Sequence, residues 1–397
     1  MHLIELELEE FRSYRRLALP LDARGLRLVG PNASGKSSLL EAIAMLATTR
    51  SPRSSSERDV LRWGSGEAFG VPPFARVRGH VGRRGGAVEI EIGLQIDPGR
   101  PGVIRKQIRL GGRAVRAMDA VGNLKAVLFS PEDVALVSGP PSGRRRYLDL
   151  LISQLDGAYL RALSRYGRVL AQRNGLLKSL ARERAPATSA AVISQLAFWD
   201  GELVALGAAI VARRWMVVRR LAELSSRRFR LLSPGEELVI RYLPSVSLEE
   251  VAVGDGTDFG RVQPIVAREF EDQLHRARGD ELRRGVSLVG PHRDDLTFAV
   301  AAADLATFGS RGQQRLAVVA LKLAETSVMT ELAGEAPVLL LDDVLSELDA
   351  RHRSFVISVA AEVEAQVVVT ATDDEVLDRP DIATLPWVRI EGGTILS

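Results

Sequence analysis

Residues 30–37 carry the sequence Gly-Pro-Asn-Ala-Ser-Gly-Lys-Ser, which fits the phosphate-binding pattern G-x-x-x-x-G-K-[ST] at every defined position. An apolar segment at 26–29 precedes this loop, and a segment with helical periodicity at 38–43 follows it. The flanks therefore predict the strand, glycine loop and helix that the pattern requires, whereas a chance glycine-rich turn would lack them. This loop constrains the chain to an α/β fold with a P-loop.

The residues of the loop have separate expected roles toward ATP. Glycines let successive backbone N–H groups turn toward one anion, and the helix start adds a partial positive charge. Lys36 can reach the β- and γ-phosphates, and the hydroxyl of Ser37 can ligate Mg²⁺. The expected ATP-binding residues of this segment are Gly30, Pro31, Asn32, Ala33, Ser34, Gly35, Lys36, Ser37 and Ser38.

A second motif follows the apolar run 338–341, which predicts a central parallel strand buried on both faces. At the tip of that strand, Asp342 can hold Mg²⁺ and Asp343 can orient or deprotonate the attacking water. An acidic turn is the alternative, and it loses force because the same chain carries a phosphate loop. About 300 residues separate the two halves of this site, so the fold must bring the chain ends together.

A third motif, Ser-Arg-Gly-Gln at 310–313, opens a segment of helical periodicity and is a second anion-binding device. One subunit needs only one phosphate cradle, so Ser310, Gly312 and Gln313 would serve the ATP of another copy. A plain helix cap is the alternative for this segment alone. The acidic turn 346–349 follows the aspartate pair, and Asp349 is expected to assist hydrolysis in the partner's site.

Composition excludes several other classes of protein. The chain has 397 residues, enough for two domains or for one domain with a large insertion, and it has no cysteine, so disulfides and thiolate metal sites are excluded. Its five histidines form no H-x-x-x-H pair, and His292 with Asp295 supplies too few ligands for a metal site. The N-terminus is not a secretory signal, and the longest apolar stretch, 203–212, is too short to span a bilayer. We expect a cytoplasmic protein without a membrane anchor.

The net charge of +3 hides an asymmetry along the chain. Residues 144–230 contain 17 Lys or Arg and 6 Asp or Glu, a surplus of +11, so the remainder of the chain is near −8. A basic segment in an otherwise acidic protein indicates a polyanion such as DNA as partner. Solvated helix faces in an arginine-rich chain are the alternative. The clusters comprise Arg144, Arg145, Arg146, Arg161, Arg165, Arg168, Arg213, Arg214, Arg219, Arg220, Arg227 and Arg228.

Hydrophobic periodicity predicts three segments along the chain. Residues 1–140 combine the P-loop with an antiparallel sheet, residues 141–280 form a basic helical lobe, and residues 281–397 return to α/β structure and complete the nucleotide-binding head. The expected strands are 3–9, 88–96, 103–110, 113–116, 367–370 and the closing hairpin 387–396, and the helical pattern of 144–231 breaks near Pro186. The polar segment 50–56 is interpreted as a surface loop.

The order of these motifs resembles the ABC-type ATPase head, in which two heads close face to face around two ATP molecules. Further motifs narrow the resemblance to the RecF family of SMC-like ABC ATPases. They occupy residues 11–14 (FRSY), 128–133 (LFSPED), 144–149 (RRRYLD), 290–296 (GPHRDDL), 310–315 (SRGQQR) and 341–349 (LDDVLSELD). The implied fold is an ABC-type head of mixed sheet, flanking helices and antiparallel β subdomain, with an inserted helical lobe.

The resemblance also implies a function in recombinational repair and replication-fork maintenance. Such a protein would dimerise on binding ATP and Mg²⁺ and would bind gapped or junction, single- and double-stranded DNA. It would work with RecR and RecO to load RecA, and slow hydrolysis would release the DNA. By analogy with SMC-type heads, Arg12 would contact phosphate; an exposed cation after a strand is the alternative.

The sequence departs from the wider ABC pattern at several positions. Asp343 occupies a position where many ABC ATPases carry Glu, although RecF proteins typically carry Asp there. No histidine follows the strand at 367–370, and no glutamine loop can be assigned. Two rival functions remain at this level: a soluble ABC ATPase that remodels proteins or ribosomes, and a nucleotide-gated scaffold in which Asp343 does little.

Overall fold

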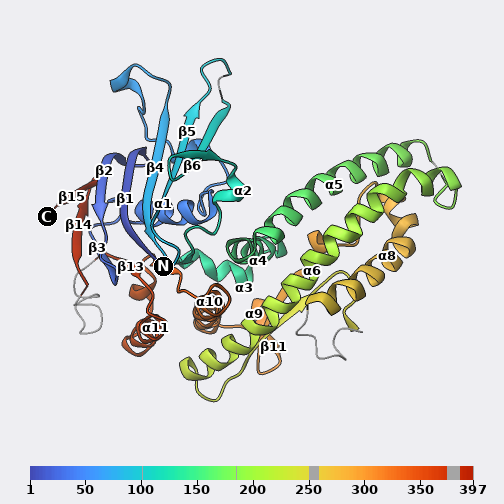
Figure 1. Ribbon diagram of the computed structural model, residues 1–397. Coiled ribbons are helices and arrows are strands. Elements are labelled where there is room, and N and C mark those ends of the chain that lie inside the picture. Colours follow the sequence, from blue (N-terminus) through green and yellow to red (C-terminus); the bar gives the residue numbers. More distant parts are fainter. Residues whose placement is uncertain (101, 185, 250–258, 373–384, 397) are drawn as a thin grey trace. The chain divides into compact units, whose positions relative to one another are not determined.

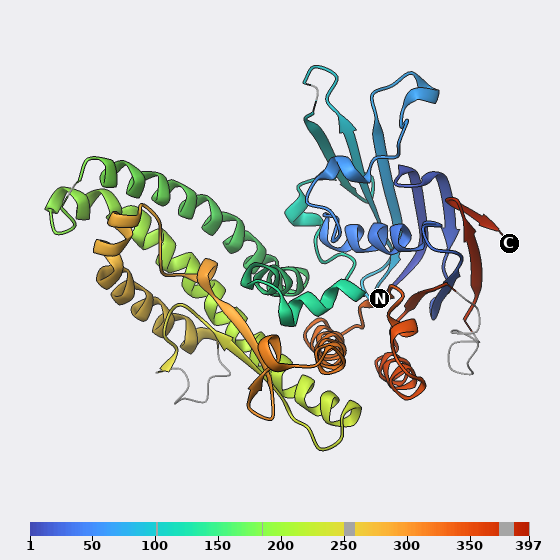
Figure 2. The same ribbon diagram turned by 180° about the vertical axis from the view of Figure 1, so that it is seen from behind.

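A computed structural model describes residues 1–100, 102–184, 186–249, 259–372 and 385–396 (Figures 1 and 2). By packing, the chain divides into two compact units. Unit 1 consists of Met1–Val134, Leu231–Pro234 and Val318–Ser397, and unit 2 consists of Ala135–Arg230 and Gly235–Ala317. Both ends of the chain thus belong to unit 1, as the motif pair at 30–37 and 342–343 requires.

Unit 1 contains a sheet whose inner strands are parallel. Its strand order is β15-β14-β3-β13-β12-β8, and only the β14–β15 hairpin is antiparallel. All residues of β12 and β13 are buried, as expected for central parallel strands. In sheet order the strands are β15 (Thr394–Leu396), β14 (Trp387–Glu391), β3 (Gly25–Val29), β13 (Val367–Ala371), β12 (Val338–Leu341) and β8 (Ala126–Phe129).

A second, antiparallel sheet of unit 1 has the order β2-β1-β4-β5-β6-β7. Its strands are β2 (Tyr14–Pro20), β1 (His2–Phe11), β4 (Phe74–Gly82), β5 (Val88–Ile96), β6 (Ile104–Leu110) and β7 (Arg113–Val115). The expected Gly-Gly turn joins β6 to β7, with positive φ angles of 52° at Gly111 and 77° at Gly112. The alternation of apolar and charged residues in β1 and β5 puts one face of this sheet into the core.

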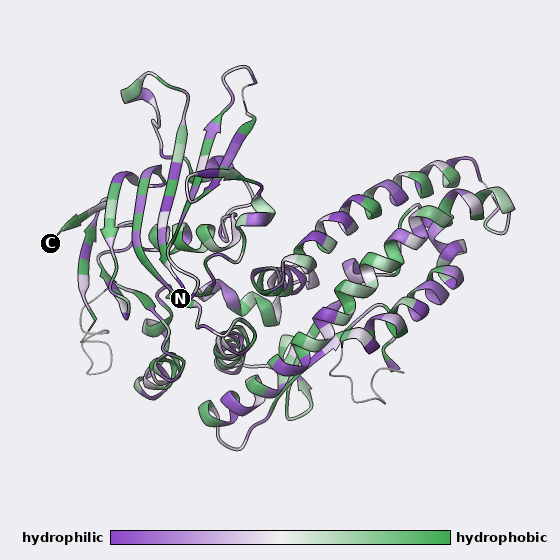
Figure 3. Ribbon diagram, in the orientation of Figure 1, coloured by the Kyte–Doolittle hydropathy of each residue, from purple (hydrophilic) through white to green (hydrophobic). Residues whose placement is uncertain are grey.

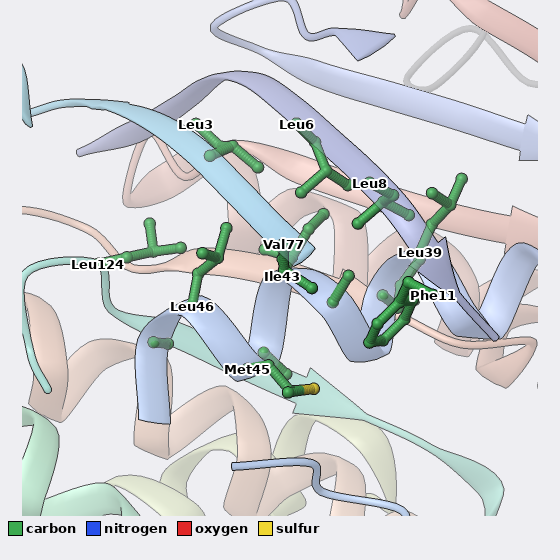
Figure 4. Close-up of a cluster of buried hydrophobic side chains, with 14 of the residues drawn as sticks. Leu3, Leu6, Leu8, Phe11, Leu39, Ile43, Met45, Leu46, Val77 and Leu124 are labelled. Atoms are coloured by element: carbon green, nitrogen blue, oxygen red, sulfur yellow. The ribbon is translucent and has the colours of Figure 1, made fainter. Parts of the chain in front are cut away.

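Helix α1 (Lys36–Thr48) is the core element of unit 1. It contacts β4 and β5 of the antiparallel sheet and β8 and β13 of the parallel sheet, and most of its residues are buried. In Figure 4 the side chains of Leu39, Ile43 and Leu46 gather with those of β1 and β4 in one cluster. Because the P-loop leads into α1, this packing fixes the loop in place.

The remaining helices of unit 1 lie in the segments between its strands. They are η1 (Glu57–Val60), η2 (Glu67–Phe69), α2 (Ala117–Ala120), η3 (Pro131–Val134), η5 (Val344–Glu347), α11 (Ala350–Glu362) and the part of α10 (Arg311–Ala333) from Val318 onward. The expected helix at 38–43 and the expected strand at 26–29 are confirmed as α1 and β3.

Unit 2 is mainly helical, as the periodicity of 144–231 predicted. Its helices are α3 (Ala135–Ser138), α4 (Pro141–Leu155), α5 (Gly157–Arg182), α6 (Ala190–Leu232), α8 (Phe259–Arg284), η4 (Pro291–Arg293) and α9 (Leu305–Phe308). The predicted break near Pro186 separates α5 from α6. A small sheet of order β11-β10-β9 completes the unit, with β9 (Leu238–Leu243), β10 (Asp295–Val300) and β11 (Ala303–Asp304).

Residues 281–317 differ from the expectation that 281–397 complete the nucleotide-binding head. By packing they group with unit 2, together with the start of α10. The reason is strand pairing, because β10 pairs with β9 and β11 and not with the parallel sheet. The periodicity of this segment indicated α/β structure, but it carried no information about which sheet the strand would join.

Two buried arginines hold the helices of unit 2 together. Arg173 of α5 is fully buried and forms ion pairs with Asp200 of α6 at 2.8 Å and with Glu281 of α8 at 2.7 Å. Arg214 of α6 is 2% exposed and forms ion pairs with Asp149 of α4 at 2.8 Å and with Asp294 at 2.9 Å. Each guanidinium therefore neutralises two carboxylates that have little access to water.

The Gly-Pro-His-Arg-Asp-Asp-Leu segment at 290–296 supports this network. The Nδ1 atom of His292 lies 2.7 Å from the hydroxyl of Tyr166, and Asp295 pairs with Arg144 at 2.6 Å. Burial lowers the pKa of His292 to about 4, so the ring is neutral near neutral pH. Its Nε2 atom faces the carbonyl oxygen of Ser287, which leaves Nδ1 to accept a hydrogen bond from the Tyr166 hydroxyl. His292 and Asp295 are thus both engaged in contacts that stabilise unit 2.

Helix α6 is long and apolar enough, by length and composition, to cross a membrane. The apolar stretch 203–212, which we judged too short to span a bilayer, is the middle of this 43-residue helix. A core helix of a soluble protein can have the same composition, and 39% of the most apolar window of α6 is buried. Asp200 and Arg214 of the same helix form the ion pairs described above, so the helix alone is weak evidence for a membrane span.

We expect Arg214→Leu to lower the free energy of unfolding by about 3–5 kcal/mol, because Asp149 and Asp294 would lose their shared cation inside the protein. Urea denaturation followed by circular dichroism measures the change. Arg161→Leu, at an exposed site of the same unit, is the matched control and should stay within about 0.5 kcal/mol of wild type. An Arg214→Leu protein as stable as the control would contradict this account of the network.

Candidate nucleotide-binding site

The P-loop borders a cavity of about 490 Å³ in unit 1, a volume within the usual range for small-molecule sites. Its lining combines the loop with residues from the turn between β1 and β2, from the segment after α1 and from the segment just after β12. The lining residues are Arg12, Ser13, Asn32, Ala33, Ser34, Gly35, Lys36, Ser37, Ser38, Arg53, Asp59, Leu61, Trp63 and Asp343. Of the expected loop residues, Gly30 and Pro31 lie outside this lining.

Close backbone packing shapes the P-loop. Gly35 has a φ of 115°, and a Cβ atom there would lie 2.7 Å from the Tyr14 hydroxyl. A Cβ atom on Gly30 would lie 2.2 Å from the carbonyl oxygen of Ile390, so both glycines are required by geometry. Gly35 is the N-cap of α1 and offers no side chain to the first turn. The helix start is therefore open toward the cavity, where it can receive an anion.

Lys36 is 4% exposed and anchored within the loop. Its ammonium group donates to the carbonyl oxygens of Gly30 at 2.7 Å and Pro31 at 3.0 Å. Burial lowers the pKa of Lys36, and the charges of Asp343 and Asp342 oppose that shift. Since an ammonium group has three donors, one remains for a phosphate oxygen.

The two halves of the predicted Mg²⁺ site meet across β13. Ser37 follows β3 and Asp342 follows β12, and the Ser37 hydroxyl donates to Oδ1 of Asp342 at 2.7 Å. Thr370, at the end of the intervening strand, lies 3.2 Å from the same carboxylate oxygen. Burial raises the pKa of Asp342, while the Ser37 hydrogen bond and the charge of Arg53 lower it. A hydroxyl and a carboxylate oxygen side by side are the kind of ligands Mg²⁺ prefers.

Asp343 is held in a strained backbone conformation at the end of β12. Its φ is 51°, and its backbone N–H donates to the Thr370 hydroxyl at 2.8 Å. The Oδ1 atom of Asp343 and the hydroxyl of Ser34 are both buried without a hydrogen-bond partner in the protein. Buried polar atoms without partners are costly. Two such atoms beside one cavity fit a site that is completed by a phosphate and an attacking water.

Arg12 occupies the cavity wall but is anchored by protein groups. Its guanidinium donates to both carboxylate oxygens of the fully buried Glu41, at 2.9 and 2.6 Å, and to the carbonyl oxygen of Asp59 at 2.6 Å. The hydroxyl of Ser51 also donates to Glu41 at 2.5 Å. Arg12 thus lines the cavity together with the P-loop, and its contact with phosphate remains a prediction.

The expected trans-acting residues lie outside this cavity. Ser310 and Gln313 form a capping box at the start of α10, because each side chain bonds the other's backbone N–H at 3.1 Å. Ser310 and Gly312 are exposed, and Gln313 also donates to Glu236 at 2.8 Å. Asp349 caps α11 by accepting the N–H of His352 at 3.0 Å. Both segments thus have a structural role, which leaves a role in the site of another copy as a proposal.

Sequence reasoning missed Arg53, Thr370 and Trp63 at this site. Arg53 belongs to the 50–56 segment that we interpreted as a surface loop, and it lines the cavity instead. Thr370 ends the predicted strand at 367–370, and nothing in the sequence around it indicates a contact with the aspartate pair. None of the three matches a local motif, since their positions depend on how distant segments pair.

Comparison with known proteins agrees with this geometry. The family described as RecF/RecN/SMC N terminal domain matches residues 2–384. The protein called DNA replication and repair protein RecF from Thermomicrobium roseum is 47% identical over 396 residues, which cover 98% of both chains. Its counterpart from Chloroflexus aurantiacus is 43% identical over the full length of both chains.

Solved structures of RecF and of SMC head domains have a similar fold. A structure of the recombination mediator protein RecF with ATP, described as part of the RecFOR pathway, has a TM-score of 0.81 at 29% identity and covers 100% of this chain and 97% of its own. An Smc head domain from Pyrococcus furiosus has a TM-score of 0.54 at 19% identity, covers 100% of this chain and 96% of its own, and supports the fold alone. The predicted ABC-type head fold is thereby confirmed.

We expect Gly35→Ala to weaken binding of a fluorescent ATP analogue by roughly tenfold or more, because the new Cβ would meet Tyr14 and Ser13 at an unfavourable φ. Gly201→Ala is the matched control, since Gly201 is an exposed helical glycine with open space around it. Circular dichroism reports whether either variant remains folded. Unchanged nucleotide binding by a folded Gly35→Ala protein would contradict the proposed cradle.

Proposed function

This chain belongs to the RecF family of DNA replication and repair proteins, and we propose that it is an ATP-operated clamp on DNA in recombinational repair. Family membership makes it a P-loop ATPase of the ABC and SMC-like type. The observation that carries the DNA part of this proposal is helix α5, whose 26 residues include six cations and no Asp or Glu. ATP binding is supported by the cavity around Lys36 and by the ATP complex of the similar RecF structure.

The proposed ATP site uses the residues already brought together in unit 1. The P-loop N–H groups and Lys36 bind the β- and γ-phosphates, and Ser37 with Asp342 holds Mg²⁺. The metal would neutralise the charge that develops on the transferred phosphoryl group. Asp343, whose Oδ1 atom lacks a protein partner, orients the attacking water. Thr370 keeps both carboxylates in position through its contacts with Asp342 and the Asp343 backbone.

A second copy of the chain would complete each site. Ser310, Gly312 and Gln313 begin a 23-residue helix, and the first two are exposed, so another molecule can reach them. There they would cap the γ-phosphate of the partner's ATP, with Asp349 assisting hydrolysis. ATP would therefore hold two copies together, and slow hydrolysis would separate them.

The exposed face of α5 is the proposed DNA contact. Arg161, Arg165, Arg168, Lys178 and Arg182 are exposed, and helical geometry places them within an arc of about 140°. Among the residues that the structure describes, only Arg165 of these five has an ion-pair partner, Glu202. The stripe is about 31 Å long, close to the roughly 34 Å of one DNA turn. In Figure 3 hydrophilic residues recur along the whole of α5.

The family suggests the wider setting. The similar RecF structure is described as a recombination mediator of the RecFOR pathway. We propose that this chain likewise acts in the cytoplasm with RecR and RecO, at gapped or junction DNA and on single- and double-stranded segments, to help load RecA. Weak, DNA-stimulated hydrolysis of ATP would then release the DNA.

The triple variant Arg161→Ala, Arg168→Ala, Arg182→Ala should bind DNA more weakly and with less dependence on salt. Each lost phosphate contact removes about 0.9 from the slope of log K against log salt, so the slope should become shallower by about 2.7. Fluorescence anisotropy with a gapped duplex across a salt series measures both quantities.

The matched control removes three exposed arginines of unit 1 and the same net charge, through Arg84→Ala, Arg100→Ala and Arg113→Ala. If both triple variants lose the same slope, α5 is not the DNA contact and the charge acts only through the net field. If neither triple variant changes the slope of log K against log salt, DNA is not bound through these arginines.

Ser310→Arg should leave ATP binding intact and prevent ATP-dependent dimerisation, because a long cation would occupy the place of the γ-phosphate. Ser189→Arg is the control, since Ser189 accepts the N–H of Val192 at the start of α6 and its loss removes a comparable helix cap. Light scattering with and without Mg-ATP gives the mass of each protein. A Ser310→Arg protein that still dimerises with ATP would contradict the trans-acting role.

A further inference from the structure

Trp63 is the most exposed large apolar side chain in the described part of the chain, at 94%. A single exposed apolar residue needs no explanation by itself. Trp63, however, lines the same cavity as the P-loop, where Ala33, Leu61 and Trp63 are the apolar side chains of the lining. The cavity therefore has a cradle for phosphate at one part of its wall and an aromatic ring at another.

The backbone around Trp63 is fixed to the end of β1. Arg12 donates its N–H to the carbonyl oxygen of Val60 at 2.8 Å, and Arg62 donates its N–H to that of Glu10 at 2.9 Å. Leu61 forms a β-bridge with Phe11 between these two hydrogen bonds. The segment 60–62 thus pairs with the end of β1, next to the cavity-lining residue Arg12.

Side chains add to this attachment. The Arg62 guanidinium pairs with the fully buried carboxylate of Glu10 at 3.0 Å, and it also donates to the carbonyl oxygen of Trp63 at 2.9 Å. Trp63 therefore combines an exposed ring with an anchored backbone. The exposure of the ring is therefore not explained by a loop without contacts, because a buried ion pair holds the backbone beside it.

We propose that Trp63 is the stacking surface for the base of the nucleotide whose phosphates bind the P-loop. Base stacking on an aromatic ring suits every base, because each has a π-face, so the ring would contribute affinity without choosing between adenine and guanine. The inference rests on the proposed ATP site and adds to it a residue that no phosphate-binding motif contains. The base would then cover the exposed face of the Trp63 ring.

Binding of Mg-ATP and of Mg-tripolyphosphate to the full chain, measured by isothermal titration calorimetry, separates the ring from the cradle. Trp63→Ala should weaken ATP binding by about 5-fold to 150-fold, the range for loss of one base–aromatic contact, and should leave tripolyphosphate binding unchanged. Trp63→Phe should restore most of the ATP affinity. GTP should lose affinity in Trp63→Ala as ATP does.

Tryptophan fluorescence gives an independent measurement, since the chain has four tryptophans. ATP should quench emission in wild type and in Trp387→Phe, an exposed tryptophan of the same unit outside the cavity lining, but not in Trp63→Phe. Quenching that persists in Trp63→Phe would overturn the inference. So would a Trp63→Ala protein that binds ATP like wild type, or one that loses ATP and tripolyphosphate affinity equally. Failure of wild type to bind either ligand would instead contradict the proposed ATP site.

Discussion

The hydrogen bond between Ser37 and Asp342 joins residues 305 positions apart, and the nucleotide site depends on it. It is possible because β3 and β12 flank β13 in one parallel sheet, so that their carboxyl ends meet at the same edge. Gln366, which is buried, adds a second link: its side chain bonds the backbone N–H and carbonyl oxygen of Leu3, at 2.7 and 2.8 Å. The first and last parts of the chain are thus joined into one unit, and helix α1 carries the P-loop between its two sheets.

The sequence predicted those parts of the fold that are determined by residues close together in the chain. The P-loop, the Gly111-Gly112 turn and the buried strands at 338–341 and 367–370 follow from glycine positions and from periodicity within a few residues. The grouping of 281–317 with the helices could not be predicted, because it depends on the pairing of β10 with β9. The same holds for Arg53 and Trp63, whose place at the cavity depends on how the segment after α1 returns to β1.

The basic surplus of residues 144–230 has two physical origins that the sequence alone cannot separate. Arg144, Arg173 and Arg214 are buried and neutralise carboxylates, so they hold the helices together and are closed to DNA. Arg161, Arg168 and Arg182 are exposed on a helix without acids. The count of basic residues therefore overstates the area that DNA can reach, and α5 is the strongest candidate for the DNA contact because its cations are exposed.

The strained backbone of Asp343 and the Ser34 hydroxyl without a hydrogen-bond partner likewise distinguish a functional loop from a merely tight turn.

The central claim is that ATP brings two copies of this chain together on DNA. The most direct test measures particle mass and binding to a fluorescent gapped duplex in parallel, with and without Mg-ATP, over a range of salt concentrations. The account predicts that Mg-ATP doubles the mass from 43.2 kDa and tightens DNA binding, and that this binding falls steeply with salt because phosphate contacts release counterions. Dimerisation on ATP without any DNA binding would contradict it, and would make the basic face of α5 a surface for a protein partner.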